Sequence, residues 1–267
     1  MAIQHGLFQF TGKMGGVIGY YMKGKYYTRT APAFVDQTPA TRHAAKDFGT
    51  ASASARIIRQ AIEGEVSLRK DGTFGNRLTS AMLSVIRADW DHKAGRRVVK
   101  TGNLQQLTRM RFNKYAEVRP QTAVQRCFDG SLSVTVIDPL KQFGDDIQHV
   151  RFRAIALFPD FGLGICKTEC SETVTLTREE AAQPLCLTIP SRNGATAIVL
   201  LEASACKLFE NKLRPTGFRQ LNAVDIIAVV PAKKEGRIRA TGYTSEVVYN
   251  YVPAPRPFNG FVSSNPG

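Results

Sequence analysis

The hydrophobic pattern of the chain changes near residue 130, and this change limits the fold more than any other feature of the sequence. Before it, apolar residues recur at the three- and four-residue spacing of amphipathic helices, and after it they alternate with polar residues as in half-buried strands. Six segments show the alternation: 131–137, 149–158, 172–177, 184–189, 195–203 and 224–230. Turns rich in Gly, Pro, Asp and Asn separate them, which predicts an antiparallel β-sandwich of Greek-key type.

The part of the chain before this change is predicted to hold a β-ribbon and three helices. Segments 17–21 and 26–30 are rich in β-formers and flank a turn at Gly24, which indicates a hairpin. Apolar residues at helical spacing predict three helices, over 41–63, 77–89 and 103–115. The only tryptophan, Trp90, is expected to hold the second helix against the core.

These patterns together predict an α+β chain in three parts. The parts are a basic ribbon-and-helix region at 1–127, the sandwich at 128–252 and an extended tail at 253–267. The helices could instead cover one sheet of the sandwich, and the boundary near residue 128 would then be artificial.

Positive charge is concentrated in the first half of the chain. Residues 1–126 hold 21 Lys/Arg and 8 Asp/Glu, whereas residues 127–267 hold 15 and 14, so the two parts carry +13 and +1. This imbalance indicates a nucleic acid, an anionic surface or an acidic protein as the partner of the first half. The alternative is that the basic residues only keep the fold soluble.

The ribbon sets lysines and an arginine among tyrosines, a mixture that contacts phosphates by charge and bases by stacking. The candidate contact residues in the ribbon, the first helix and the loop after the second helix are Lys13, Lys23, Lys25, Tyr26, Arg29, Arg42, Lys46, Arg56, Arg59, Arg96 and Arg97. Two alternatives stay open. The tyrosines could pack on the following helix, and the basic helix face could be an ordinary solvated surface.

No pattern in the sequence completes a catalytic or metal-binding motif, so we expect no enzyme activity, no cofactor and no metal. Cys166 and Cys170 could reach one zinc ion, but a structural zinc site takes four ligands and no second pair follows. Asp89, Asp91 and His92 could hold a divalent ion or serve a hydrolase or nuclease. Because basic residues lie beside them, a cluster of salt bridges at a helix end is the better interpretation.

The sequence predicts a cytoplasmic protein, or one incorporated into a virion or other large particle. Its first residues lack the pattern of a secretory signal, and no segment is apolar for long enough to span a membrane. Five scattered cysteines fit a reducing compartment with free thiols.

The opening segment GKMGGVIGYYMKGKYYTRTAP, followed by QTPATRHAAKDFGTAS, resembles the start of an uncharacterised protein family of the Bacteroidota. The resemblance covers roughly the first quarter of the chain well. It implies a β-rich fold, identifies no catalytic residue and leaves the function open.

Two hypotheses for the function follow from these observations. The first is a non-enzymatic structural or assembly protein, a homo- or hetero-oligomeric subunit that holds an anionic partner with its basic half. The second is a nucleic-acid-binding protein that contacts phosphates without reading sequence, since the chain has no helix-turn-helix, zinc-finger or RNP signature.

Overall fold

The computed structural model describes residues 2–6, 8–32, 34, 36–66, 68, 71–140, 143–144, 146–191, 194–210, 212–233 and 249–251. The chain divides into two compact units, Met1–Ala44 and Ala45–Gly267. This division differs from the predicted one, because residue 128 lies inside the second unit. The predicted tail at 253–267 lies outside the described residues.

The first unit is a small antiparallel sheet with the strand order β1-β4-β3-β2. Its strands are β1 (Ala2–Ile3), β2 (Gly12–Met14), β3 (Val17–Met22) and β4 (Lys25–Thr30). The predicted hairpin joins β3 to β4, and its turn residues Lys23 and Gly24 have φ values of 50° and 80°. Two successive positive φ values give a turn whose twist matches that of the flanking strands.

This sheet has almost no interior of its own. Gly19 is the one buried residue among those described in the unit. Two ring carbons of Phe10 lie 2.7 and 2.8 Å from the place where a Cβ on Gly19 would stand, so a larger residue there would displace the ring. The Gln4 side chain holds the Phe10 segment, accepting from the Phe10 N–H at 3.0 Å and donating to its carbonyl at 3.1 Å.

The second unit begins with a layer of helices. The helix α1 (Pro39–Glu65) starts in the first unit and continues here, and α2 (Phe74–Arg87) and the 3-10 helix η1 (Thr101–Leu107) follow. The Thr38 hydroxyl accepts a hydrogen bond from the Thr41 N–H at 3.2 Å and caps α1, which begins two residues before the start expected from sequence. Pro39 then occupies the first helical position, where its missing N–H costs nothing.

The third predicted helix, over 103–115, is wrong beyond its first turns. After η1 the backbone leaves the helix, with Arg109 at a φ of 73°, and is hydrogen-bonded to β13 (Asn222–Val230): the Arg109 N–H donates to the Ile226 carbonyl at 2.8 Å, and the Phe112 N–H to the Val224 carbonyl at 2.8 Å. The Arg111 guanidinium contacts the buried Asp225 carboxylate at 3.1 Å. Tertiary hydrogen bonds and this ion pair outweigh local helix propensity.

Two antiparallel sheets make up the rest of the unit. In the six-stranded sheet the long central strands are β7 (His149–Asp160) and β11 (Ala197–Phe209). The strands β8 (Ile165–Cys170) and β9 (Val174–Thr177) pair with β7, and β12 (Lys212–Pro215) and β13 pair with β11. The four-stranded sheet has the order β10-β6-β5-β14, from β10 (Leu185–Ile189), β6 (Leu132–Val136), β5 (Thr122–Arg126) and β14 (Tyr249–Tyr251). The short 3-10 helices η2 (Glu180–Ala182) and η3 (Arg219–Leu221) lie in connections.

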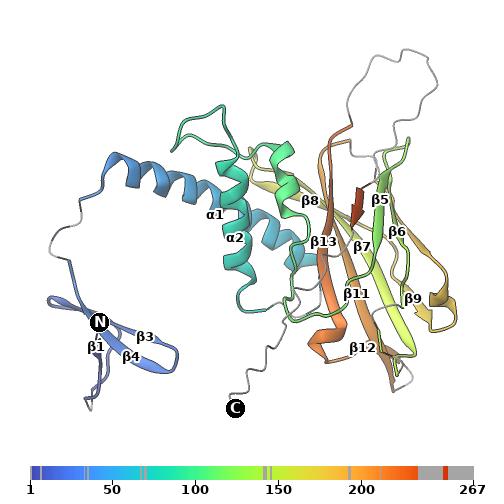
Figure 1. Ribbon diagram of the computed structural model, residues 1–267, viewed down its shortest axis with the longest axis horizontal. Coiled ribbons are helices and arrows are strands. Elements are labelled where there is room, and N and C mark those ends of the chain that lie inside the picture. The colour runs from blue at the N-terminus through green and yellow to red at the C-terminus, as the bar shows by residue number, and fades with distance from the viewer. Residues whose placement is uncertain are drawn as a thin grey trace, which may run out of the picture. The chain divides into compact units, whose positions relative to one another are not determined.

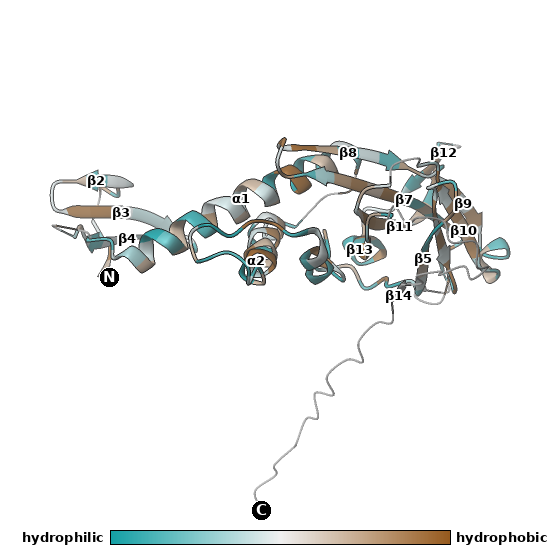
Figure 2. Ribbon diagram, turned by 90° about the horizontal axis from the view of Figure 1, so that it is seen from above, coloured by the Kyte–Doolittle hydropathy of each residue, from teal (hydrophilic) through white to brown (hydrophobic). Residues whose placement is uncertain are grey.

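The six-stranded sheet is buried on both faces because its residues alternate between two cores. Ala154 and Val199 face the four-stranded sheet, where they share a core with residues such as Val134. Ile155 and Leu200 face the other way and share a core with α1, α2 and η1. Figure 1 shows the helices on one side of this sheet and the four-stranded sheet on the other, and Figure 2 shows the hydrophobic stretches of its strands in brown.

The prediction of an α+β fold with extensive antiparallel sheet is therefore confirmed. The helices belong with the sheets because their apolar stripes are buried against β7, β11 and β13. This packing explains why the chain does not divide near residue 128.

Candidate nucleic-acid interface

Residues 88–100, called here the 88–100 loop, follow α2 and are held in place by a buried carboxylate. The Asp89 side chain has no exposed surface. One of its oxygens accepts from the Val98 N–H at 3.0 Å and contacts His92 Nδ1 at 2.7 Å. The other accepts from the Asp91 N–H at 3.2 Å and lies 3.3 Å from Lys100 Nζ. The hydrogen bond from Val98, with those of His92 and Lys100, outweighs burial and lowers the pKa of Asp89 to about 2.

A second buried carboxylate, from Asp47 on α1, fixes the far side of the 88–100 loop. Its oxygens accept from the Gly95 N–H at 2.9 Å and from Arg97 Nη1 at 3.4 Å. Gly95 has a φ of 82°, a conformation that other residues rarely adopt. Asp89 thus ties the two ends of the loop together and Asp47 holds its middle, so the backbone that carries the exposed side chains is fixed.

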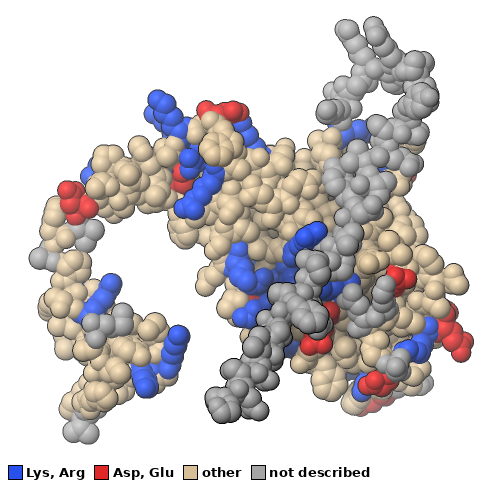
Figure 3. Space-filling model, viewed as in Figure 1, with Lys and Arg blue, Asp and Glu red and all other residues tan. Residues whose placement is uncertain are grey.

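The 88–100 loop presents an aromatic ring and several cations to solvent. Trp90 is 87% exposed, so the expectation that it holds α2 against the core is wrong. The buried Asp89 beside it anchors the end of the helix instead. Lys93 and Arg96 are exposed, and no ion pair joins either to another residue in the part of the chain that the structure describes. Figure 3 shows Lys and Arg side chains gathered over the end of α2 and this loop.

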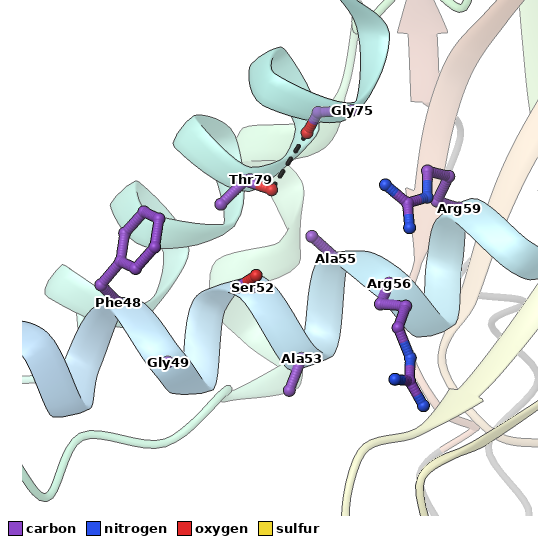
Figure 4. A pocket seen from close by; sticks show the side chains of 9 residues that line it. All are labelled: Phe48, Gly49, Ser52, Ala53, Ala55, Arg56, Arg59, Gly75 and Thr79. Atoms are coloured by element: carbon purple, nitrogen blue, oxygen red, sulfur yellow. Dashed lines mark hydrogen bonds between the residues drawn. The ribbon is translucent and has the colours of Figure 1, made fainter. Parts of the chain in front are cut away.

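A shallow groove of about 430 Å³ lies beside α1 and α2. Gly49, Ser52, Ala53, Ala55, Gly75 and Thr79 line it together with three larger side chains. Figure 4 shows that Phe48 points toward α2, that Arg59 extends on the side of α1 that faces Gly75, and that Arg56 points away from α2. Phe48 is 51% exposed, so it does not join the buried apolar stripe of α1, which is formed by Ala51, Ala55, Ile58 and Ile62.

The predicted contact residues fall in both units. Lys13, Lys23, Lys25, Tyr26, Arg29 and Arg42 belong to the first unit; Lys46, Arg56, Arg59, Arg96 and Arg97 belong to the second. Lys46 precedes the loop anchor Asp47 on α1 and is exposed. Arg97 and Arg59 have acidic partners, at 3.4 Å from Asp47 and 3.9 Å from Glu63 respectively.

The sequence analysis did not select several residues of the 88–100 loop as candidate contacts. Trp90 was placed in the core because tryptophans usually are buried, and Lys93 and Lys100 were not selected from the basic loop. The signal available for Trp90 was its position between two aspartates, since a core position rarely has charged residues on both sides.

The polar clusters considered for metal or catalytic roles form ordinary internal contacts. No group of three or more potential metal ligands occurs among the described residues. Asp89, Asp91 and His92 form a helix-end cluster with Lys100, which contacts both aspartates. Cys170 lies 3.0 Å from Arg153 Nη2, and burial raises the pKa of its thiol.

Comparison with protein-family models, with curated proteins and with solved structures finds no match to this chain. Of the helices that the structure describes, none is both long and apolar enough to cross a membrane.

Proposed function

We propose that this chain acts by binding, as a non-enzymatic subunit of a larger assembly that holds a nucleic acid without reading its sequence. The observation that carries the proposal is the 88–100 loop. It is fixed by two buried carboxylates and presents Trp90 to solvent beside the cations Lys93 and Arg96.

An exposed indole ring is well suited to a nucleic-acid partner. Its faces stack on bases, and alanine substitution of such a ring typically costs about 1–3 kcal/mol per base. Lys93, Arg96 and the nearby α1 residue Lys46 supply charge for the phosphates. Because the loop is already held by Asp47 and Asp89, binding orders fewer groups and loses less entropy.

The same chemistry favours binding that does not depend on sequence. Lysine and arginine contacts to phosphates carry no sequence information, and every base offers a face for stacking. An acidic protein would satisfy the cations equally well, but it would not require an exposed tryptophan among them.

A role in an assembly is supported by the first unit. A four-stranded sheet whose longest strands have six residues and which buries only Gly19 among its described residues needs a surface to lie against. In this proposal the two packed sheets of the second unit, a sandwich of Greek-key type, are the scaffold. A cytoplasmic particle or a virion that encloses nucleic acid would use both the 88–100 loop and the N-terminal sheet.

The test is binding of the purified full-length protein to single-stranded and duplex oligonucleotides of unrelated sequence across a salt series. We expect log K to fall with log salt, and Lys93→Gln with Arg96→Gln to lower the slope on duplex by about 1.8, at 0.9 per phosphate contact. Trp90→Ala should weaken single-strand binding by roughly 5- to 150-fold.

Matched control variants remove an exposed aromatic ring and two exposed cations elsewhere on the second unit. Phe128→Ala removes another largely exposed aromatic ring, and Lys167→Gln with Lys212→Gln removes two exposed lysines from strands of the six-stranded sheet. These variants should bind like the unaltered protein. Equal losses in the loop variants and the controls, or no binding at low salt, would contradict the proposal.

A further inference from the structure

Strand register sorts the side chains of the N-terminal sheet onto two chemically different faces. Residues directly opposite each other in an antiparallel ladder share a face, and successive residues along a strand alternate between faces. Lys13 pairs with Ile18, and Ile18 with Arg29. Tyr20 pairs with Tyr27 two residues further along, and Met22 pairs with Lys25. One face therefore carries Ile3, Lys13, Ile18, Tyr20, Met22, Lys25, Tyr27 and Arg29, and we call it the basic face.

The opposite face of the sheet carries no charge. Its residues are Ala2, Gly12, Met14, Val17, Gly19, Tyr21, Tyr26, Thr28 and Thr30. The segment around Phe10 crosses this uncharged face and packs against Gly19, and the Gln4 side chain binds its backbone. The chain itself thus covers part of the uncharged face.

The basic face combines cations with a stacked pair of rings. Tyr20 and Tyr27 lie with ring centroids 5.8 Å apart and an angle of 19° between their planes. Lys13, Lys25 and Arg29 are exposed around them. No hydrogen bond or ion pair joins these three side chains to another residue within the described part of the chain. Positions 1–44 contain a single acidic residue, Asp36.

We propose that the basic face binds single-stranded nucleic acid, with bases against Tyr20 and Tyr27 and phosphates on Lys13, Lys25 and Arg29. This inference rests on the proposed function, and it adds a second contact surface and a preference for single strands. Charge complementarity decides the occupant, because this face offers three cations and no carboxylate. Tyrosine rings between those cations favour a ligand whose bases are free to stack, which a duplex does not provide.

The experiment uses the full-length protein and two pairs of tyrosines that differ in the face they occupy. Tyr20→Leu with Tyr27→Leu changes the basic face, and Tyr21→Leu with Tyr26→Leu changes the same number of cross-strand paired rings on the uncharged face. The probes are a twelve-residue oligothymidylate and an abasic strand of the same length and charge.

We expect the variant on the basic face to bind oligothymidylate at least about 5-fold more weakly, and the control variant to bind within about 2-fold of the unaltered protein. Neither variant should change binding to the abasic strand. Because leucine at these positions could disturb the sheet, a second variant tests charge alone: Lys13→Gln, Lys25→Gln and Arg29→Gln should lower the single-strand salt slope by about 2, at 0.7 per phosphate.

Three results would overturn the inference. They are equal losses from the two tyrosine pairs, an abasic strand bound as tightly as oligothymidylate, and an unchanged salt slope in the charge variant. If Trp90→Ala still weakens binding in that case, the proposed function stands and the basic face is not a contact surface. If the unaltered protein binds neither strand at low salt, the proposed function fails as well.

Discussion

Replacing Asp47 with alanine, compared with the same replacement of Asp91, separates the anchoring role of the Asp47 carboxylate from its charge. Asp47 accepts hydrogen bonds from the Gly95 N–H at 2.9 Å and from Arg97 at 3.4 Å. Without it the Gly95 N–H loses its partner, and we expect the free energy of unfolding to fall by about 1–2 kcal/mol. The loop would then have to be ordered on binding, at about 0.5–1.5 kcal/mol for each immobilised side chain. Affinity for an oligonucleotide should fall about 3- to 10-fold.

Electrostatics alone predicts that Asp47→Ala would raise the affinity for an oligonucleotide instead. Removing a negative charge about 10 Å from a phosphate in water is worth about 0.4 kcal/mol, or roughly a 2-fold gain in affinity. Asp91→Ala is the matched control, since Asp91 is in the 88–100 loop that Asp47 anchors, is largely exposed, and is paired only to Lys100 among the described residues. We expect Asp91→Ala to raise affinity about 2-fold.

The assay is fluorescence anisotropy with a labelled single strand at constant low salt, together with urea denaturation of each variant. The two variants remove the same charge, but only Asp47→Ala also removes an anchor of the loop, so their affinities should change in opposite directions. A gain in affinity for Asp47→Ala that equals the gain for Asp91→Ala would refute the reasoning that the anchored loop conformation matters for binding.

Three further predictions concern the second unit. Arg111→Met leaves Asp225 buried without its partner and should lower the free energy of unfolding by about 3–5 kcal/mol at neutral pH. Burial raises the pKa of Asp225 above its ordinary value and Arg111 opposes this, so without Arg111 the carboxyl is protonated at a still higher pH and the cost should shrink as pH falls from 7 toward about 4; urea denaturation at pH 4 and 7 checks the sign. Burial raises the pKa of Cys166 to about 11, so iodoacetamide at pH 8 should label the exposed Cys186 much faster, as followed by mass spectrometry. Ile62→Ala should cost about 2–5 kcal/mol and shift one cooperative transition seen by both helix and sheet signals, whereas separate transitions would contradict the shared core.

The alternation of apolar and polar residues correctly predicted the long strands. The segments 149–158 and 195–203 correspond to β7 and β11, whose alternate residues enter two different cores. The strand β8 was missed because the same residues, including Cys166 and Cys170, were considered as a metal motif. An edge strand with polar residues such as Lys167 and Glu169 gives a weak hydrophobic signal.

The irregular parts of the fold could not be predicted from local pattern. The helical spacing predicted a helix over 103–115, but the backbone of residues 109–112 is hydrogen-bonded to β13, more than a hundred residues further along the chain. The conformation of the loop that carries the exposed Trp90 includes hydrogen bonds from Gly95 to Asp47 and from Val98 to Asp89, and a sequence pattern does not identify these partners. The two faces of the N-terminal sheet, by contrast, follow from register and could be derived once the hairpin turn at Gly24 was placed.

The most direct test of the central claim uses the intrinsic fluorescence of the protein. Because Trp90 is the only tryptophan, its emission reports on the 88–100 loop alone. We predict that a single-stranded oligonucleotide quenches this emission saturably, and that added salt reverses the quenching as phosphate contacts are lost. Unchanged emission at oligonucleotide concentrations that saturate binding by anisotropy would show that the nucleic acid does not stack on Trp90, and would contradict the account.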